Sequence, residues 1–347
     1  MRRGRRSGYF TIVAVHSTAR GPSLGGCRMW EYEDARAAVR DALRLSRAMT
    51  FKSAVAGLPL GGGKGVIMLP RAEPAPGPEQ RRAALLDFGD TVASLEGRYV
   101  TAEDVGTSDQ DMAVIAERTR HVTGLASGSG DPSRWTALGV ETAIRVACER
   151  AFGSGSLQDR SIAVIGLGRV GGKLAELLAQ GGGQLVVSDV DQTKRALANR
   201  LGARWTDPAS ALTAEVDVVA PCALGGMLDD ETVPALQCRV VAGAANNQLG
   251  ADGVADLLTE LGILWAPDFV ANAGGIINIA VELEPQGYDE RRARERVLEV
   301  GSTLRTIFDD AERSGGTPLS AAMNLARRRL EEASAPPRAA SRGAPAA

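Results

Sequence analysis

A glycine-rich loop between a short apolar strand and a helix constrains the fold of this 347-residue chain more than any other segment. The expected strand covers 162–165, the loop covers 166–171, and an apolar helical pattern follows it. A second expected strand, 185–188, ends directly before Asp189. Strand, loop, helix and strand in this order form the unit from which parallel, doubly wound α/β sheets are built.

The spacing of the glycines also predicts a ligand. Gly166 permits the tight turn, Gly168 lets the backbone approach a pyrophosphate, and Gly171 allows the helix to pack closely on the strand. The N-terminus of the helix then faces the phosphates. A glycine-rich turn that binds no dinucleotide is the alternative. The predicted cofactor contacts in the loop are Gly166, Gly168, Arg169, Val170 and Gly171.

Asp189 lies 23 residues after Gly166, at the end of the second strand. A carboxylate there accepts hydrogen bonds from a free ribose 2′-hydroxyl and repels a 2′-phosphate. We therefore expect NAD, and not NADP, as the cofactor.

Further apolar strands at 216–220 and 239–242 extend the predicted sheet, whereas the first third of the chain follows a different pattern. The sequence predicts an α/β protein of two domains separated by a cleft, with a Gly/Ser-rich hinge at 124–134. The expected division is a substrate-binding and catalytic domain over 1–134 plus 288–334, a Rossmann domain over 135–287, and a disordered Ala/Pro/Arg-rich tail over 335–347. Residues 21–27 and the glycines at 61–63 are expected to be loops.

Two lysines, Lys52 and Lys64, stand among apolar residues and glycines. A solvated surface lysine does not need such surroundings, whereas a partly dehydrated lysine with a shifted pKa does. The pair predicts an anionic substrate and a chemical step on it.

Composition excludes several classes of function. The net charge of -2 gives no sign of a nucleic-acid or acidic-membrane partner, and no stretch is long and apolar enough to span a bilayer. The four cysteines form no CxxC pair, so we expect no metal site, and free thiols in a reducing cytoplasm. The two histidines, His16 and His121, lie outside any ligand cluster, and no Tyr-xxx-Lys pair exists. Lysines and carboxylates remain as candidate acid and base groups.

Eight ordered blocks resemble the glutamate/leucine/phenylalanine/valine dehydrogenases, closest to the leucine/valine/phenylalanine branch, and the likeness runs from about residue 9 to 332. The GGGK loop and the NAGG segment are the most specific. The resemblance implies reversible, NAD(P)-dependent deamination of an L-amino acid to a 2-oxo acid and ammonia. The blocks are GPSLGGCRMW (21–30), MTFK (49–52), LGGGK (60–64), YVTAEDVGT (99–107), GSGDPS (128–133), APCALGG (220–226), GAANNQ (243–248) and APDFVANAGG (266–275).

The same resemblance implies roles for three residues. Lys52 would hold the substrate α-carboxylate, Lys64 would activate water and polarise the carbonyl, and Asp104 would exchange a proton with the amino group. Taken alone, Lys52 has the alternative of complementing a helix dipole, and Asp104 that of capping a turn.

Other positions follow from the matched motifs. Thr136 and Asn246 correspond to residues at the nicotinamide end, and Asn272 to one near the substrate amino group. A helix N-cap for Thr136 and loop hydrogen bonding for the asparagines remain alternatives. The remaining predicted contacts are Gly25 and Met49 for the substrate, and Ala220, Cys222 and Ala244 for the cofactor.

Three apolar residues predict the substrate class. Leu24 stands where glutamate-specific relatives carry a lysine, and an apolar residue there would leave a buried side-chain carboxylate unpaired. Ile276 and Ile279 fall where the branched-chain relatives have valines, and the resemblance implies that their branched side chains narrow the substrate pocket. We therefore expect an aliphatic, branched-chain amino acid, with phenylalanine as the alternative.

Relatives usually carry a helix and a strand before the segment that begins at Gly8, so we expect a misplaced start or an altered assembly. The expected assembly is a homo-oligomer. A catalytically weak NAD-binding homologue, or a Rossmann enzyme of other chemistry such as a transferase, is the rival interpretation.

Overall fold

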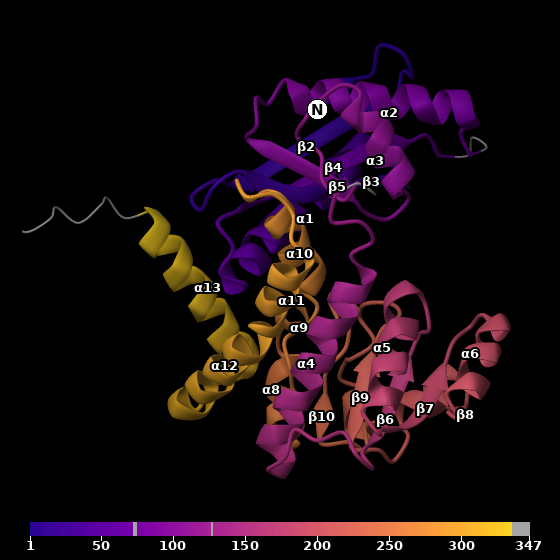
Figure 1. Ribbon diagram of the computed structural model, residues 1–347, viewed down its shortest axis with the longest axis vertical. Helices are drawn as coiled ribbons and strands as arrows, with labels where there is room; N and C mark the ends of the chain where they lie inside the picture. Colours follow the sequence, from indigo (N-terminus) through magenta and orange to yellow (C-terminus); the bar gives the residue numbers. More distant parts are fainter. Residues whose placement is uncertain (72–74, 126–127, 335–347) are drawn as a thin grey trace, which may run out of the picture.

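The computed structural model describes residues 1–71, 75–125 and 128–334, so the predicted disordered tail lies outside the described residues. Figure 1 shows two α/β bodies, one built from the first part of the chain and one from the middle. Helices from the last part of the chain contact both bodies. The predicted α/β class with a doubly wound second body is confirmed.

The first body contains a five-stranded sheet in the order β1-β2-β4-β3-β5. Strand β3 runs parallel to both β4 and β5, and β2 runs antiparallel to β4. The strands are β1 (Arg2–Arg3), β2 (Phe10–Ser17), β3 (Ser23–Glu31), β4 (Gly61–Leu69) and β5 (Tyr99–Glu103), and the helices are α1 (Ala35–Val55), α2 (Pro78–Ala93) and α3 (Asp109–Ala116).

The prediction of loops was wrong for 23–27 and 61–63, which belong to paired central strands, whereas Gly21 and Pro22 precede β3 in a bend. The glycines within the two strands serve close packing instead of turning the chain. A Cβ on Gly25 would lie 1.8 Å from the carbonyl oxygen of Gly63, and one on Gly62 would lie 2.1 Å from the backbone nitrogen of Thr50. The sheet is therefore thin at this point, and α1 lies directly on it.

Helix α1 starts at a side-chain cap and buries small residues. Asp34 accepts a hydrogen bond from the backbone N–H of Ala37 at 2.7 Å, as expected of an N-cap. Ala38, Ala42 and Ser46 are fully buried, which is the residue size that a glycine-lined sheet admits. The last turns of α1 thereby bring Lys52 towards the same region as Lys64 on β4.

The second body contains a six-stranded parallel sheet in the order β11-β10-β9-β6-β7-β8. Strand β6 lies between β7 and β9, so the chain reverses direction across the sheet at β6, where α/β proteins bind ligands at the carboxyl ends of the strands. The strands are β6 (Ser161–Ile165), β7 (Gln184–Ser188), β8 (Arg204–Trp205), β9 (Val218–Pro221), β10 (Val240–Val241) and β11 (Leu264–Trp265). The helices are α4 (Ser133–Phe152), α5 (Arg169–Gln180), α6 (Arg195–Arg200), α7 (Pro208–Leu212) and α8 (Val254–Glu260), with short 3-10 turns at η1 (Gln192–Lys194) and η2 (Val233–Ala235).

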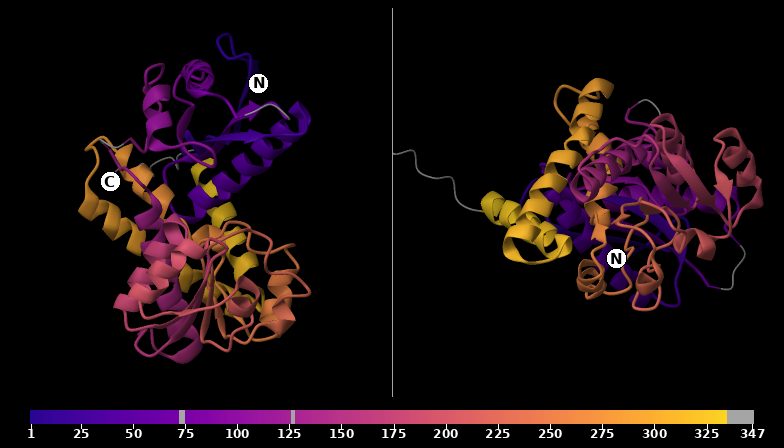
Figure 2. Two further views of the ribbon diagram at one scale, coloured as in Figure 1. Left: turned by 90° about the vertical axis from the view of Figure 1, so that its right-hand side faces the viewer. Right: turned by 90° about the horizontal axis from the view of Figure 1, so that it is seen from below.

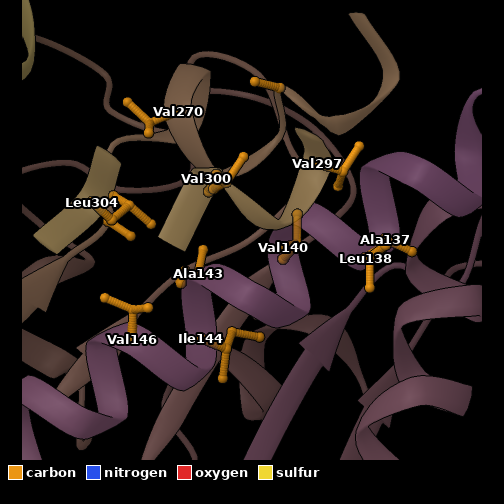
Figure 3. Close-up of a cluster of buried hydrophobic side chains, with 14 of the residues drawn as sticks. Ala137, Leu138, Val140, Ala143, Ile144, Val146, Val270, Val297, Val300 and Leu304 are labelled. Atoms are coloured by element: carbon orange, nitrogen blue, oxygen red, sulfur yellow. The ribbon is translucent and has the colours of Figure 1, made fainter. Parts of the chain in front are cut away.

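The last third of the chain adds α9 (Asp268–Ala271), α10 (Gly274–Glu282), α11 (Glu290–Leu298), α12 (Val300–Ser314) and α13 (Pro318–Ser334). Figure 3 shows Val297, Val300 and Leu304 facing the apolar side of α4, so α11 and α12 pack on the helix that opens the second body. Helix α13 runs on from α12 and contacts α1 (Figure 1, Figure 2). The C-terminal helices thus connect both bodies. No helix in the described ranges has the length and apolar character needed to cross a membrane.

Candidate active site

The centre of the candidate site is an ion pair that reaches across β3, which lies between β4 and β5 in the sheet. Lys64 lies on β4, and its Nζ is 2.7 Å from Oδ2 of Asp104, which directly follows β5. The lysine is 4% exposed. Its flanking residue Gly65 admits no side chain, because a Cβ there would lie 2.4 Å from the ring of Phe88. The ammonium is therefore held against one carboxylate with little access to water.

The surroundings shift both groups of this pair. Burial lowers the pKa of Lys64, although the Asp104 carboxylate opposes the change. Burial alone would raise the pKa of Asp104, but the Lys64 ammonium and the Arg28 guanidinium outweigh it and hold the pKa below its usual value. The arrangement provides an ionised carboxylate beside a lysine that loses its proton more readily than a surface lysine.

Lys52 joins the two bodies. Its Nζ donates to Oδ1 of Asn272 at 2.6 Å, and Asn272 in turn donates from Nδ2 to the carbonyl oxygen of Ala244 at 3.1 Å and to Oδ1 of Asn246 at 2.9 Å. The pKa of Lys52 is lowered to about 8, mainly by burial and also by the nearby Lys64, whereas the carboxylates of Asp268 and Asp104 oppose the change. The predicted substrate residues Lys52 and Asn272 are thus in direct contact, and Asn272 is hydrogen-bonded to the predicted cofactor residues Ala244 and Asn246.

The apolar residues expected around the substrate are buried or partly buried. Leu24 is 1% exposed, Ile276 and Ile279 are buried, and Met49 packs on the apolar cluster that contains all three. Gly25 is fixed differently, since its carbonyl oxygen accepts a hydrogen bond from the Tyr99 hydroxyl at 2.6 Å.

The glycine loop has the geometry expected for a pyrophosphate. Gly166 has a φ of +98°, and a Cβ on Gly171 would lie 1.9 Å from the carbonyl oxygen of Gly166. A Cβ on the exposed Gly168 would meet no atom within 4 Å. Helix α5 begins here without a side-chain cap, so no capping side chain occupies its first N–H groups. These residues fit a dinucleotide.

Asp189 at the end of β7 is tied to this loop. Its Oδ2 accepts from the backbone N–H of Leu167 at 2.6 Å, and its Oδ1 accepts from that of Asp191 at 2.8 Å. The carboxylate is therefore held in one orientation beside the loop, where each oxygen retains capacity to accept a further hydrogen bond.

The remaining predicted cofactor residues lie at the carboxyl ends of the strands or on α4. Ala220 is buried in β9, Cys222 follows that strand, and Ala244 and Asn246 follow β10. Thr136 lies inside the first turn of α4, where its hydroxyl donates to the carbonyl oxygen of Pro132 at 3.1 Å. The alternative that Thr136 caps this helix is wrong, because the helix begins at Ser133.

The ion pairs of two arginines were missed from the sequence. Arg28 binds Asp104, with Nε 3.0 Å from Oδ2. Arg169, predicted as a cofactor contact, also forms ion pairs with Glu103 at 3.6 Å and Asp131 at 3.4 Å, which link the glycine loop to the first part of the chain. A cation inside a glycine-rich and apolar run is the signal that selected Lys52 and Lys64, and the same signal was present at Arg28.

A buried lysine–carboxylate pair in one α/β body and a dinucleotide-type loop in the other define a two-domain, nucleotide-dependent dehydrogenase class. Comparison with known proteins specifies that class. The description "Glu/Leu/Phe/Val dehydrogenase, dimerisation domain" matches residues 1–121, and "Glutamate/Leucine/Phenylalanine/Valine dehydrogenase" matches residues 187–335.

Individual relatives cover nearly the whole chain. A leucine dehydrogenase of Bacillus subtilis is 42% identical over 94% of this chain and 89% of its own length. A valine dehydrogenase of Streptomyces albus is 44% identical over 95% and 91%. The crystal structure of L-tryptophan dehydrogenase from Nostoc punctiforme superimposes with a TM-score of 0.81 at 39% identity, covering 94% of both chains. The chain belongs to the Glu/Leu/Phe/Val dehydrogenase family and is an amino-acid dehydrogenase.

Proposed function

We propose that this enzyme catalyses the NAD-dependent, reversible oxidative deamination of an apolar L-amino acid, with a preference for leucine, valine or isoleucine. The products are the 2-oxo acid and ammonia. The observation that carries the proposal is the buried Lys64–Asp104 pair beside Lys52, a second lysine of lowered pKa. Relatives at similar identity include leucine, valine and L-tryptophan dehydrogenases, so the chemistry is better supported than the substrate.

Lys52 would bind the substrate α-carboxylate. Its present partner, Asn272, is uncharged and accepts only one of the three protons of the ammonium. A carboxylate supplies the missing counter-charge, and ion pairing raises the pKa of the lysine so that it stays protonated in the complex. Asn272 would keep the ammonium oriented and lie near the substrate amino group.

Asp104 and Lys64 would then handle the protons. Asp104, ionised beside two cations, accepts a proton from the substrate ammonium and leaves a neutral amine. A bound nicotinamide would accept the hydride from the substrate α-carbon. Lys64, whose pKa burial lowers, takes a proton from the water that attacks the resulting iminium carbon. Collapse of the carbinolamine expels ammonia and leaves the 2-oxo acid.

NAD is the proposed cofactor because Asp189 presents a fixed carboxylate next to the glycine loop. A 2′-phosphate would meet like charge there, whereas a 2′-hydroxyl would find an acceptor. Comparison of kcat/KM with NAD and with NADP tests this part of the proposal. Equal values for the two cofactors would contradict it.

The aliphatic preference rests on Leu24, Ile276 and Ile279, which are all buried in one apolar cluster. A glutamate side chain would place a carboxylate against Leu24 without a cation, which is costly. Discrimination between leucine and phenylalanine depends on pocket depth, which is worth about 1–3 kcal/mol for a methylene. Phenylalanine dehydrogenase activity is the second candidate.

A substrate panel with NADH absorbance as the readout tests the function. We expect kcat/KM to be highest for branched aliphatic L-amino acids and lowest for glutamate. The Leu24→Lys variant should raise kcat/KM for glutamate and lower it for leucine, because it adds the missing cation and removes apolar contact. The Leu24→Met variant is the matched control of similar length. A wild-type preference for phenylalanine would overturn the aliphatic assignment, and no turnover with any amino acid would favour the weak homologue.

We also propose that the catalytic unit comprises 1–134 plus 288–334 and that 135–287 bind the cofactor. A homo-oligomer is proposed from the description of residues 1–121 as a dimerisation domain. Light scattering coupled to size-exclusion chromatography tests the assembly, and a monomeric mass would contradict it.

A further inference from the structure

We propose that Arg28 is a positioning residue for the reaction, which reserves one oxygen of Asp104, Oδ1, for the substrate amino group. The inference rests on the proposed role of Asp104. Arg28 lies on β3. Among the described residues, its hydrogen bonds go to Asp104 and Asp41, and none goes to Lys52 or Lys64.

The first observation is that two cations share one carboxylate oxygen. Arg28 Nε lies 3.0 Å and Lys64 Nζ lies 2.7 Å from the same atom, Oδ2 of Asp104. Within the described ranges, no hydrogen bond to Oδ1 is found, and both cations make their closest approach to Oδ2. The carboxylate is therefore fixed through one oxygen, and the other remains available to receive a proton.

The second observation is that Arg28 is itself held at its far end. Its Nη1 lies 3.0 Å from Oδ2 of Asp41 on α1, and the Tyr32 hydroxyl donates to the same oxygen at 2.8 Å. Arg44 occupies the other oxygen of Asp41 at 2.9 Å. A planar guanidinium reaches two carboxylates at once through different nitrogens, whereas the single ammonium of a lysine does not span both.

This geometry fixes both the direction and the charge of Asp104. Rotation of the carboxylate would break two charge-assisted hydrogen bonds, which are stronger than neutral ones. The guanidinium also lowers the pKa of Asp104 and that of Lys64, so it favours the protonation states with which the proposed reaction begins. Other ionisable groups that act on this pair are Cys27 on β3, Lys52 on α1, and Tyr99 and Glu103 on β5.

The main test compares Arg28→Gln with Arg28→Lys. We expect Arg28→Gln to lower kcat at least about 100-fold, the scale of a lost proton-transfer arrangement, and to move the acid limb of the kcat/KM profile to higher pH. Arg28→Lys restores the positive charge, so its acid limb should return towards that of the wild type while kcat stays low. NAD affinity, measured by calorimetry, should be unchanged in both variants.

The Asp41→Asn variant provides a second test in case the substitution at position 28 prevents folding. It keeps Arg28 and Asp104 but weakens the far anchor, so kcat should fall by about 10-fold, less than in Arg28→Gln, with the acid limb unmoved. A wild-type rate and pH profile in Arg28→Gln would overturn the inference. If Arg28→Gln does not fold, wild-type kcat in Asp41→Asn overturns it instead.

The Asp104→Asn variant separates this inference from the function on which it rests. Loss of activity in Asp104→Asn together with wild-type behaviour of Arg28→Gln would reject only the role of Arg28. Full activity in Asp104→Asn would reject the proposed proton acceptor, and with it the inference. A matching loss in both variants, with a shifted acid limb only in Arg28→Gln, supports both.

Discussion

The proposed catalytic pair and the proposed nucleotide loop lie in different bodies and are built in opposite ways. Around Lys64 and Asp104, function depends on side chains that approach one another, with charges that burial makes costly to leave unpaired. Around Gly166–Gly171, it depends on the absence of side chains, so that backbone N–H groups stay accessible. The first region should therefore fail when atoms are removed, and the second when atoms are added.

Removal of the Lys64 side chain should have the largest effect on the rate. We expect Lys64→Ala to lower kcat by about 100- to 10,000-fold, the usual range for loss of a general acid or base. NAD affinity should stay within about twofold, because Lys64 makes no contact with the glycine loop among the described residues. Steady-state kinetics and calorimetric titration with NAD measure the two quantities. An active Lys64→Ala enzyme would refute the assigned base.

Addition of one methyl group to the loop tests the other half of the comparison. In Gly171→Ala the new Cβ would lie 1.9 Å from the carbonyl oxygen of Gly166, so the loop must move. We expect a loss of stability of about 1–3 kcal/mol, as for other overpacked sites, and a large loss of NAD affinity. Thermal unfolding and NAD titration measure the two effects.

Gly168→Ala is the matched control for Gly171→Ala, because it adds the same atom where nothing lies within 4 Å and where φ is -66°. It should retain wild-type stability yet bind NAD more weakly, since the methyl group enters the space left for the pyrophosphate. Unchanged NAD affinity in Gly168→Ala would show that the loop does not hold the phosphates.

The two regions also differed in how much the sequence revealed. The strand, loop and helix at 162–178 were predictable because each carries a strong local pattern and the glycine spacing has a specific structural cause. The glycine-rich first halves of β3 and β4 were not, because their glycines are required by close contacts with residues outside the local sequence, whereas the end of β4 at 66–69 was predicted as a strand. The backbone of Gly63 leaves no room for a side chain at position 25, and the backbone of Thr50 leaves none at position 62. A pattern within one short segment does not reveal either contact.

The candidate site shows the same division. Lys52, Lys64 and Asp104 were selected from their unusual surroundings and from family motifs, and the fold brings them into one region, although their roles stay predictions. Arg28 was overlooked because it directly follows residues 21–27, which were taken for a loop, and an arginine beside a loop needs no explanation. Once that segment is a central strand, a partly buried arginine requires partners, and Asp104 and Asp41 are those partners.

The smallest expected effect lies where the two bodies meet, at Lys52 and Asn272, and it is a pH dependence. Burial lowers the pKa of free Lys52 to about 8, so the lysine loses its charge as pH rises through that value. Binding of a carboxylate needs the charged form, and each pH unit above the pKa removes up to about a factor of ten in affinity. We expect the dissociation constant of a 2-hydroxy acid analogue to rise above pH 8. Such an analogue lacks the amino group, whose own titration would otherwise obscure the result.

Lys52→Arg sharpens this measurement, because a guanidinium keeps its charge throughout the accessible pH range. Its affinity for the analogue should be weaker than that of the wild type at pH 7, since the longer, planar group does not reproduce the contact with Asn272. Its pH dependence above pH 8, however, should be flat. An equally steep rise in both enzymes would assign the titration to another group, and Lys64 would be the first candidate because burial also lowers its pKa. If the dissociation constant rises above pH 8 only in the wild type, the charge that binds the carboxylate belongs to Lys52, the residue that joins the two bodies.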